Sequence, residues 1–192
     1  MSTLVAMRAS FRPKSNSGIL LDAALEAARE AGATAEVVDI TRVRLAPCRA
    51  CDACASDGVC VQKDDLARIL DAVWRAERLL IATPVHYMAA PAQLKLFIDR
   101  TQCCYNRKYV LRRSLPADVR ARRRGGVIAV CGSKVQAAFD GLDFTMKYLF
   151  DALEMDFAER LYVRRVDRPG EIAEHPERIE EARALGRRLA EG

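Results

Sequence analysis

Short apolar segments alternate with helix-like segments along the chain, and this alternation constrains the fold more than any other feature. Five segments are short, rich in apolar residues and without strict alternation, as strands of a buried parallel sheet are; they cover residues 4–7, 35–40, 78–83, 126–131 and 158–166. The segments that follow them repeat apolar residues at helical spacing; they cover residues 18–31, 64–76, 90–101, 140–154 and 175–190. Strands joined by single helices predict a parallel sheet with right-handed crossovers and helices on both faces.

Two strand orders compete for a doubly wound sheet of this kind. The dinucleotide-binding order is accompanied by a G-x-G-x-x-G segment after the first strand, and no such segment follows residues 4–7. We therefore predict an α/β fold with three αβα layers and a five-stranded parallel sheet in the flavodoxin-like order 2-1-3-4-5. No linker or internal repeat interrupts the pattern, so we expect residues 1–192 to form a single domain.

The composition requires neither a disulfide nor a membrane. A chain of 192 residues with 51% hydrophobic residues has enough apolar surface for a full core. No apolar run approaches the roughly 18 residues of a membrane span, and residues 1–8 lack the pattern of a signal peptide. We expect a cytoplasmic protein with no membrane contact. In a reducing compartment, its seven cysteines are more often ligands or catalytic thiols than disulfide halves.

Positive charge is concentrated between residues 107 and 124, where eight Lys or Arg residues stand against one acid, Asp118. A solvated basic loop is the simpler interpretation. The alternative is a site for a phosphate-bearing cosubstrate, such as the 2′-phosphate of NADPH, or for an acidic redox partner. Nucleic acid is disfavoured because only Tyr105 and Tyr109 lie nearby as stacking groups and no nucleic-acid-binding motif is present.

The loop after the first strand carries groups that bind phosphate. Residues 9–18 are rich in hydroxyl, amide and cationic side chains and lead directly into a helix. A helix N-terminus attracts anions through its unpaired N–H groups and its dipole. Side chains of this loop can add hydrogen bonds to phosphate oxygens; the candidates are Ser10, Arg12, Ser15, Asn16 and Ser17. An ordinary polar loop with Ser15 or Asn16 as the helix cap would have a similar composition.

Two further loops are expected at the same edge of the sheet, where open α/β sheets bind ligands. The loop after the third strand contributes Pro84, Val85, His86 and Tyr87, and the loop after the fourth contributes Gly132 and Ser133. A ligand with a phosphate at one end and a flat aromatic system at the other fits all three loops, and flavin mononucleotide (FMN) is such a ligand. His86 is either a structural histidine or a donor to the flavin ring or to a quinone-like acceptor, which makes it the candidate catalytic side chain.

A cysteine-rich loop, residues 47–62, follows the second strand. Its four cysteines have the spacing C-x2-C-x2-C-x5-C and are Cys48, Cys51, Cys54 and Cys60. Four thiolates can ligate a [4Fe–4S] cluster or zinc, and the spacing alone does not identify the metal. Structural zinc sites usually use two separated C-x2-C pairs, whereas three cysteines are crowded here. Thiols without metal are the third alternative, and Cys103, Cys104 and Cys131 are interpreted as structural.

Several of these segments resemble one known family. Residues 10–17 resemble the S-x-R-x-x-S-N-T phosphate loop of the NAD(P)H-dependent FMN reductases, and residues 83–87 followed by residues 92–100 resemble that family's second signature. The four cysteines before residues 61–65 are similar to those of its iron–sulfur flavoprotein branch. Two departures are Ala9, where the family has glycine, and Met88, where it has a small residue.

The resemblance implies a flavodoxin-like fold and assigns roles to the loops. The residues of the first loop would hold the FMN phosphate, those of the third would pack on the ring, and Gly132 and Ser133 would lie along its polar edge. The four cysteines would hold a [4Fe–4S] cluster near the flavin, in a homodimer or homotetramer. A reduced nicotinamide, NAD(P)H, or a protein donor would supply electrons, and a small molecule or protein would accept them.

Two other functions are compatible with the same residues. One is a cluster-free NAD(P)H-dependent reductase of flavins, quinones or nitroaromatic compounds. The other is a flavodoxin-like electron carrier without enzymatic activity. No nicotinamide-binding fingerprint is present in the sequence, so the use of NAD(P)H is implied by the resemblance alone.

Overall fold

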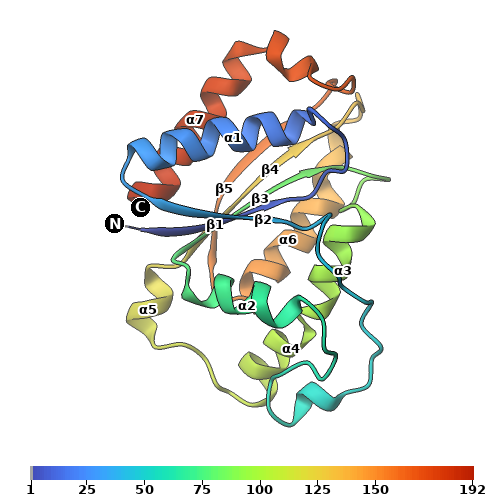
Figure 1. Ribbon diagram of the computed structural model, residues 1–192, viewed down its shortest axis with the longest axis vertical. Helices are drawn as coiled ribbons and strands as arrows, with labels where there is room; N and C mark the ends of the chain where they lie inside the picture. Colours follow the sequence, from blue (N-terminus) through green and yellow to red (C-terminus); the bar gives the residue numbers. More distant parts are fainter. Residues whose placement is uncertain (1) are drawn as a thin grey trace.

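A five-stranded parallel sheet forms the centre of the computed structural model, which describes residues 2–192. The strand order is β2-β1-β3-β4-β5, as predicted. The strands are β1 (Thr3–Arg8), β2 (Thr34–Asp39), β3 (Arg78–Pro84), β4 (Arg124–Val130) and β5 (Asp156–Val163). All four pairings between neighbouring strands are parallel, so the carboxyl ends of the strands meet at one edge, at the right of Figure 1.

The burial of each strand follows its place in the sheet. β3 lies between β1 and β4, and all but its last residue is buried. β2 lies at one edge, and Val38 is its only buried residue. A register shift between Gly125 and Gly126 interrupts the pairing of β4 with β5. The continuously apolar sequence of the inner strands is therefore explained by helices that cover both faces.

Two helices cover one face of the sheet, α1 (Asn16–Glu30) and α7 (Pro176–Glu191). They run together above the strands in Figure 1. Their close approach depends on Gly186, because a Cβ atom there would lie 2.0 Å from the carbonyl oxygen of Ala24. Leu20, Leu25, Leu185 and Leu189 are among the residues that fill this half of the core.

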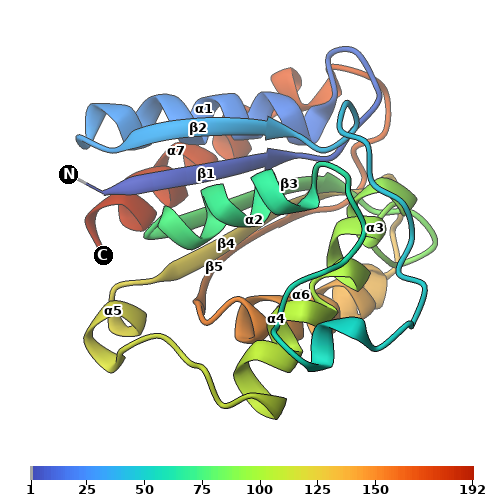
Figure 2. The same ribbon diagram turned by 60° about the horizontal axis from the view of Figure 1, so that its bottom comes forward.

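Three helices cover the opposite face: α2 (Leu66–Arg75), α3 (Ala92–Arg100) and α6 (Asp140–Ala152). Figure 2 brings this side of the molecule forward. The core here contains Ile69, Phe97, Met146 and Phe150. Two pairs of stacked rings, Phe150 with Phe157 and Phe139 with Tyr162, join α6 and the residue before it to β5. The predicted three layers are thus present, with the sheet in the middle.

The ten predicted segments lie within a few residues of the observed elements. Several short helices were not predicted, however. They are η1 (Ala53–Ala55), α4 (Gln102–Tyr105), η2 (Asn106–Val110), α5 (Ala117–Ala121), η3 (Gln136–Phe139) and η4 (Glu171–Glu174). Each is too short to show a helical repeat of apolar residues. In the part of the chain that the structure describes, no helix has the length and apolar character needed to cross a bilayer.

Several cations of the basic stretch between residues 107 and 124 have partners within the fold. Lys108 Nζ lies 2.7 Å from Asp151 Oδ1, and Arg107 Nη1 lies 3.4 Å from Glu154 Oε1. Arg123 is buried and donates to backbone carbonyl oxygens, including that of Trp74 at 2.8 Å. The last residues of the basic stretch lead into the amino end of β4, away from the carboxyl edge of the sheet. These contacts give Arg107, Lys108 and Arg123 structural roles.

Candidate functional site

A cavity of about 270 Å³ opens at the carboxyl edge of the sheet, lined by the loops that follow β1, β3, β4 and β5. Nine of the eleven residues predicted to hold FMN line it. They are Ser10, Arg12, Ser15, Asn16, Ser17, Pro84, Val85, His86 and Gly132. Because β1 and β3 are neighbours, the phosphate loop and the ring loop lie side by side although about 70 residues separate them in the sequence.

The predicted phosphate loop ends at a capped helix N-terminus. Ser15 is the N-cap of α1, and its hydroxyl oxygen accepts a hydrogen bond from the Gly18 N–H at 3.1 Å. Gly18 fits closely against this cap, since a Cβ atom there would lie 2.5 Å from Ser15 Oγ. Asn16 and Ser17 begin the helix and are buried. This first turn has the geometry that binds anions in other proteins.

A segment that the sequence did not single out closes one side of the cavity. Arg12 Nη1 donates to the Asp167 carbonyl oxygen at 2.7 Å. Asn16 Nδ2 donates to the Arg168 carbonyl oxygen at 2.9 Å, and Asn16 Oδ1 accepts from the Ile172 N–H at 3.1 Å. The Asn16 side chain therefore holds the segment after β5 in place. The local sequence around Asn16 does not predict these hydrogen bonds, because the partner residues lie about 155 positions away in the chain.

The ring loop contains a tight turn. His86 and Ala89 exchange two backbone hydrogen bonds of 3.0 Å, and the two residues between them, Tyr87 and Met88, have φ angles of 49° and 60°. Positive φ at both central positions is typical of a type I′ turn, which usually contains Asn or Gly. The Tyr87 side chain is fully exposed and lies outside the cavity lining.

Ser133 was predicted to line the cavity but does not. Eight other residues line it that were not predicted from the sequence. They are Ala9, Phe11, Pro91, Val130, Cys131, Val166, Asp167 and Pro169. Gly132 allows the Asp167 side chain to approach, since a Cβ atom there would lie 2.9 Å from the Cβ of Asp167. Burial raises the pKa of the Cys131 thiol, so this residue lines the cavity as a neutral group.

The four cysteines of the cysteine-rich loop line one small hollow of about 30 Å³, together with Arg100, Gln102 and Cys103. Cys48 and Cys51 lie on its exposed outer wall, and Cys54 and Cys60 are partly buried. Ala50 and Asp52, on either side of Cys51, have φ angles of 48° and 54°. Left-handed residues of this kind help to form the backbone concavities that bind anions, iron–sulfur clusters included.

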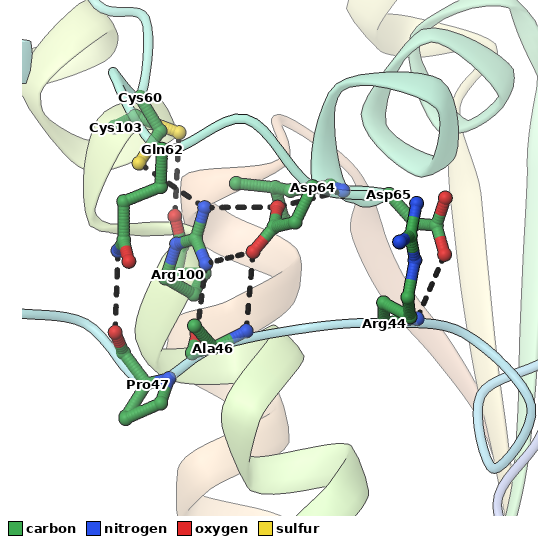
Figure 3. A network of polar contacts seen from close by, with 10 residues as sticks. Arg44, Ala46, Pro47, Cys60, Gln62, Asp64, Asp65, Arg100 and Cys103 are labelled. Carbon is green, nitrogen blue, oxygen red and sulfur yellow. Dashed lines mark hydrogen bonds and ion pairs between the residues drawn. The ribbon is translucent and has the colours of Figure 1, made fainter.

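Two buried side chains donate hydrogen bonds to cysteine sulfurs. Arg100 Nη2 lies 3.3 Å from Cys60 Sγ, and Asn106 Nδ2 lies 3.2 Å from Cys54 Sγ. The close-up in Figure 3 shows the guanidinium of Arg100 between Cys60 and the Asp64 carboxylate. A hydrogen bond of this kind favours the thiolate, which is the form that binds metal. At Cys54, however, burial outweighs the hydrogen bond from Asn106 and raises the pKa of the thiol above its ordinary value.

The cysteine-rich loop provides sulfur ligands around a small hollow. Across residues 2–192, no three His, Cys, Asp or Glu side chains converge in a group that could hold a single metal ion. The hollow that the four cysteines line has a volume of about 30 Å³, and the wall that carries Cys48 and Cys51 is exposed. The four thiols, their two buried donors and the left-handed residues nevertheless fit an anionic, sulfur-ligated group.

The strand order and the cavity at the carboxyl edge define a flavodoxin-like α/β protein. The profile of the family described as NADPH-dependent FMN reductase matches residues 2–139. This is well over half of the chain, and the chain belongs to that family. The match includes the phosphate loop, the ring loop and the cysteine-rich loop.

Relatives of known sequence support the iron–sulfur flavoprotein branch. An iron–sulfur flavoprotein of Methanosarcina thermophila is 33% identical over 125 residues, which cover 64% of this chain and 65% of the relative. One from Archaeoglobus fulgidus is 35% identical over 96 residues, or 50% of this chain and 44% of the relative. The chain therefore spans about half to slightly under two thirds of the length of these relatives.

Solved structures agree with the fold. An NAD(P)H:quinone oxidoreductase from Methanothermobacter marburgensis is similar with a TM-score of 0.69 and 19% identity, and the match covers 99% of this chain and 96% of the other. An FMN-dependent NADH-azoreductase from Bacillus anthracis, in complex with FMN, has a TM-score of 0.69 and 17% identity, with 99% and 100% covered. At these identities the similarity establishes the fold alone.

Proposed function

We propose that the cavity at the carboxyl edge binds FMN and that the chain is a flavin oxidoreductase. The observation that carries the proposal is the convergence of the phosphate loop and the ring loop on one cavity of about 270 Å³. Membership of the NADPH-dependent FMN reductase family supports the same ligand.

In this proposal the first loop holds the phosphate and the third loop holds the ring. The first turn of α1 supplies backbone N–H groups, and Ser10, Arg12, Ser15 and Ser17 supply side-chain donors. Pro84, Val85 and His86 form the wall against the ring, with the Tyr87 side chain turning inward from its exposed position. The Gly132 backbone and Ser133 lie along the polar edge of the ring. His86 is the candidate donor to the ring or to an acceptor.

We propose in addition that Cys48, Cys51, Cys54 and Cys60 hold a [4Fe–4S] cluster. The names of the relatives and the hydrogen bonds to the Cys54 and Cys60 sulfurs support this proposal. Bound FMN supplies two-electron chemistry and the cluster one-electron chemistry, so together they connect a two-electron donor to a one-electron partner. The donor is NAD(P)H or a protein, and the acceptor is a small molecule or a protein. Cytoplasmic location and a homodimer or homotetramer remain part of the proposal.

Anoxic reconstitution with iron, sulfide and FMN tests both cofactors. The purified protein is expected to retain close to one FMN, released on denaturation, and about four iron and four sulfide per chain. NADH and NADPH are then offered separately with a quinone acceptor. Absence of bound flavin would overturn the proposed function, and flavin without iron would overturn the cluster.

A cluster-free NAD(P)H-dependent reductase is the second candidate. The small hollow around the cysteines favours it, since the structure has no preformed space for a cluster. The two candidates share the FMN site and differ only in iron content. Full turnover with a quinone in protein that carries FMN and negligible iron would select this candidate.

A further inference from the structure

The positively charged side chain of Arg100 is buried, and burial of a charge carries an unfavourable desolvation free energy. Arg100 is the last residue of α3, it is 1% exposed, and it lines the hollow of the cysteine-rich loop. A buried guanidinium destabilises a fold unless it is paired and hydrogen-bonded. The contacts of Arg100 therefore indicate why a cation occupies this position.

Those contacts join the two ends of the cysteine-rich loop (Figure 3). Arg100 Nη1 donates to the Ala46 carbonyl oxygen at 2.7 Å, just before the first cysteine, and Nη2 donates to Cys60 Sγ, the last one, at 3.3 Å. Both Nη atoms also bind the Asp64 carboxylate, at 2.7 and 3.1 Å. Asp64 in turn accepts a hydrogen bond from the Ala46 N–H at 3.1 Å. One guanidinium thus closes the loop around the four thiols.

We propose that Arg100 is a positioning residue for the metal centre, which clamps both ends of the cysteine-rich loop and holds a permanent positive charge against the Cys60 ligand sulfur. This inference rests on the proposed cluster. It adds a role for a residue that is not a ligand, lies 40 residues from Cys60 in the sequence and is supplied by a different element.

The charge of Arg100 is maintained in its buried position. A guanidinium group cannot be deprotonated in a protein, so Arg100 carries its charge into the buried position. Within residues 2–192 its Nε–H has no acceptor. Over the same range, Arg123 has a similarly unpaired Nε–H and makes no hydrogen bond to a cysteine. The contacts with the cysteine-rich loop, and not the unpaired Nε–H, therefore distinguish Arg100.

The charge of Arg100 predicts the direction in which the reduction potential of the cluster should change in each variant. A positive charge beside a ligand sulfur stabilises the more negative, reduced state of a cluster and raises its reduction potential. Replacing Arg100 leaves the negative charge of Asp64 behind, so the potential should fall. Replacing Asp64 by Asn leaves the positive charge uncompensated, so the potential should rise. Structural damage alone would not produce shifts of opposite sign.

The experiment compares Arg100→Gln, Arg100→Lys and Asp64→Asn with the wild-type holoprotein. Arg100→Gln is expected to lose iron to a chelator about 10- to 100-fold faster, as expected when a partner of a metal ligand is removed, and to have a lower cluster potential. Arg100→Lys retains the positive charge but cannot form the paired hydrogen bonds that the two Nη atoms make with the Asp64 carboxylate, Ala46 and Cys60. It is expected to keep a potential near that of wild type, while amides 46–64 of the metal-free protein exchange faster.

Arg123→Gln is the matched control, because it also removes a buried arginine, but one whose hydrogen bonds go to backbone carbonyl oxygens and not to a cysteine. It is expected to lower stability and leave the cluster potential unchanged. The inference would be overturned, and the proposed cluster would stand, if Arg100→Gln and Asp64→Asn had the same cluster potential as wild type. Shifts of the same sign in both variants would have the same consequence. Wild-type protein that binds FMN but takes up no iron and sulfide would overturn both the inference and the proposed cluster.

Discussion

At the scale of single residues, the phosphate loop contains two cations with different surroundings. Arg12 lines the cavity and donates to the Asp167 carbonyl oxygen, whereas Lys14 lies outside the cavity lining. Arg12 can form a bidentate pair with a phosphate, which a lysine cannot. The structure thus distinguishes two residues that the sequence alone treats alike.

Arg12→Ala is expected to weaken FMN binding about 10- to 100-fold, which corresponds to the loss of a hydrogen bond between charged groups. Riboflavin, which lacks the phosphate, should bind both proteins equally. Isothermal titration or fluorescence quenching measures both ligands, and Lys14→Ala is the control. An equal loss of affinity for FMN and riboflavin would assign Arg12 to the ring or to the fold instead of the phosphate.

At the scale of elements, the carboxylate of Asp143, near the start of α6, joins this helix to β5 through hydrogen bonds. Asp143 Oδ1 accepts hydrogen bonds from Arg160 Nε at 2.8 Å and from the Tyr162 hydroxyl at 2.7 Å. Burial raises the pKa of Asp143, but the bonds to Tyr162 and Arg160 outweigh it and lower the pKa below the ordinary 3.8. This junction matters for the site because α6 also supports the ring loop. A Cβ atom at Gly141 would lie 2.8 Å from the Met88 carbonyl oxygen.

The lowered pKa predicts how the stabilising effect of Asp143 depends on pH. A carboxyl whose pKa is lower in the folded state stabilises the fold fully above its unfolded value, and this effect is lost as the pH falls through the folded value. Asp143→Asn should therefore have a smaller free energy of unfolding than wild type at pH 7. The two proteins should converge at about pH 2.

Urea unfolding at several pH values, with Glu181→Ala on the outer face of α7 as the control, measures this difference. Among the residues that the structure describes, Glu181 forms only an exposed ion pair with Arg178, so the control substitution should change the free energy of unfolding by at most about 1 kcal/mol at any pH. A difference between wild type and Asp143→Asn that stays constant down to pH 2 would show that the charge of Asp143 does not contribute.

At the scale of the whole molecule, the cavity at the carboxyl edge and the hollow of the cysteine-rich loop have no lining residue in common. They are built by different segments: the cavity by loops at strand ends, and the hollow by residues 48–62 and the segment from Arg100 to Cys103. We therefore expect the two cofactors to bind independently.

Cys51→Ser should remove or greatly reduce the bound iron while it leaves the FMN dissociation constant unchanged. Cys51 is exposed, so the substitution should not disturb the core. Arg49→Ala, an exposed neighbour on the same loop, should retain both cofactors. Iron analysis and flavin titration on each protein test the prediction, and a loss of FMN affinity in Cys51→Ser would reveal coupling between the sites.

The periodicity of the chain was sufficient to predict the five strands and the helices that follow them, and the absence of a G-x-G-x-x-G segment after the first strand selected the order of the sheet. Segments such as residues 78–83 are apolar because they are buried on both faces, and burial of this kind is visible in the sequence itself. Short segments between residues 101 and 124 were not predicted. Their helices span a turn or little more, and buried charges such as Arg123 are held by backbone carbonyl groups that no pattern announces.

The sequence by itself determined the fold, the phosphate loop and the cysteine spacing, because each depends on residues that are close together in the chain. Only the tertiary structure decided that Asn16 holds the segment after β5, that Tyr87 points outward from a strained turn and that Arg100 binds Cys60 and Asp64. The contacts of Asn16 and Arg100 join residues from 36 to 156 positions apart. The contacts of Asn16 exist because parallel crossovers bring distant loops to one edge of the sheet. Those of Arg100 exist because the end of α3 packs against the cysteine-rich loop, and no local pattern of side chains encodes either arrangement.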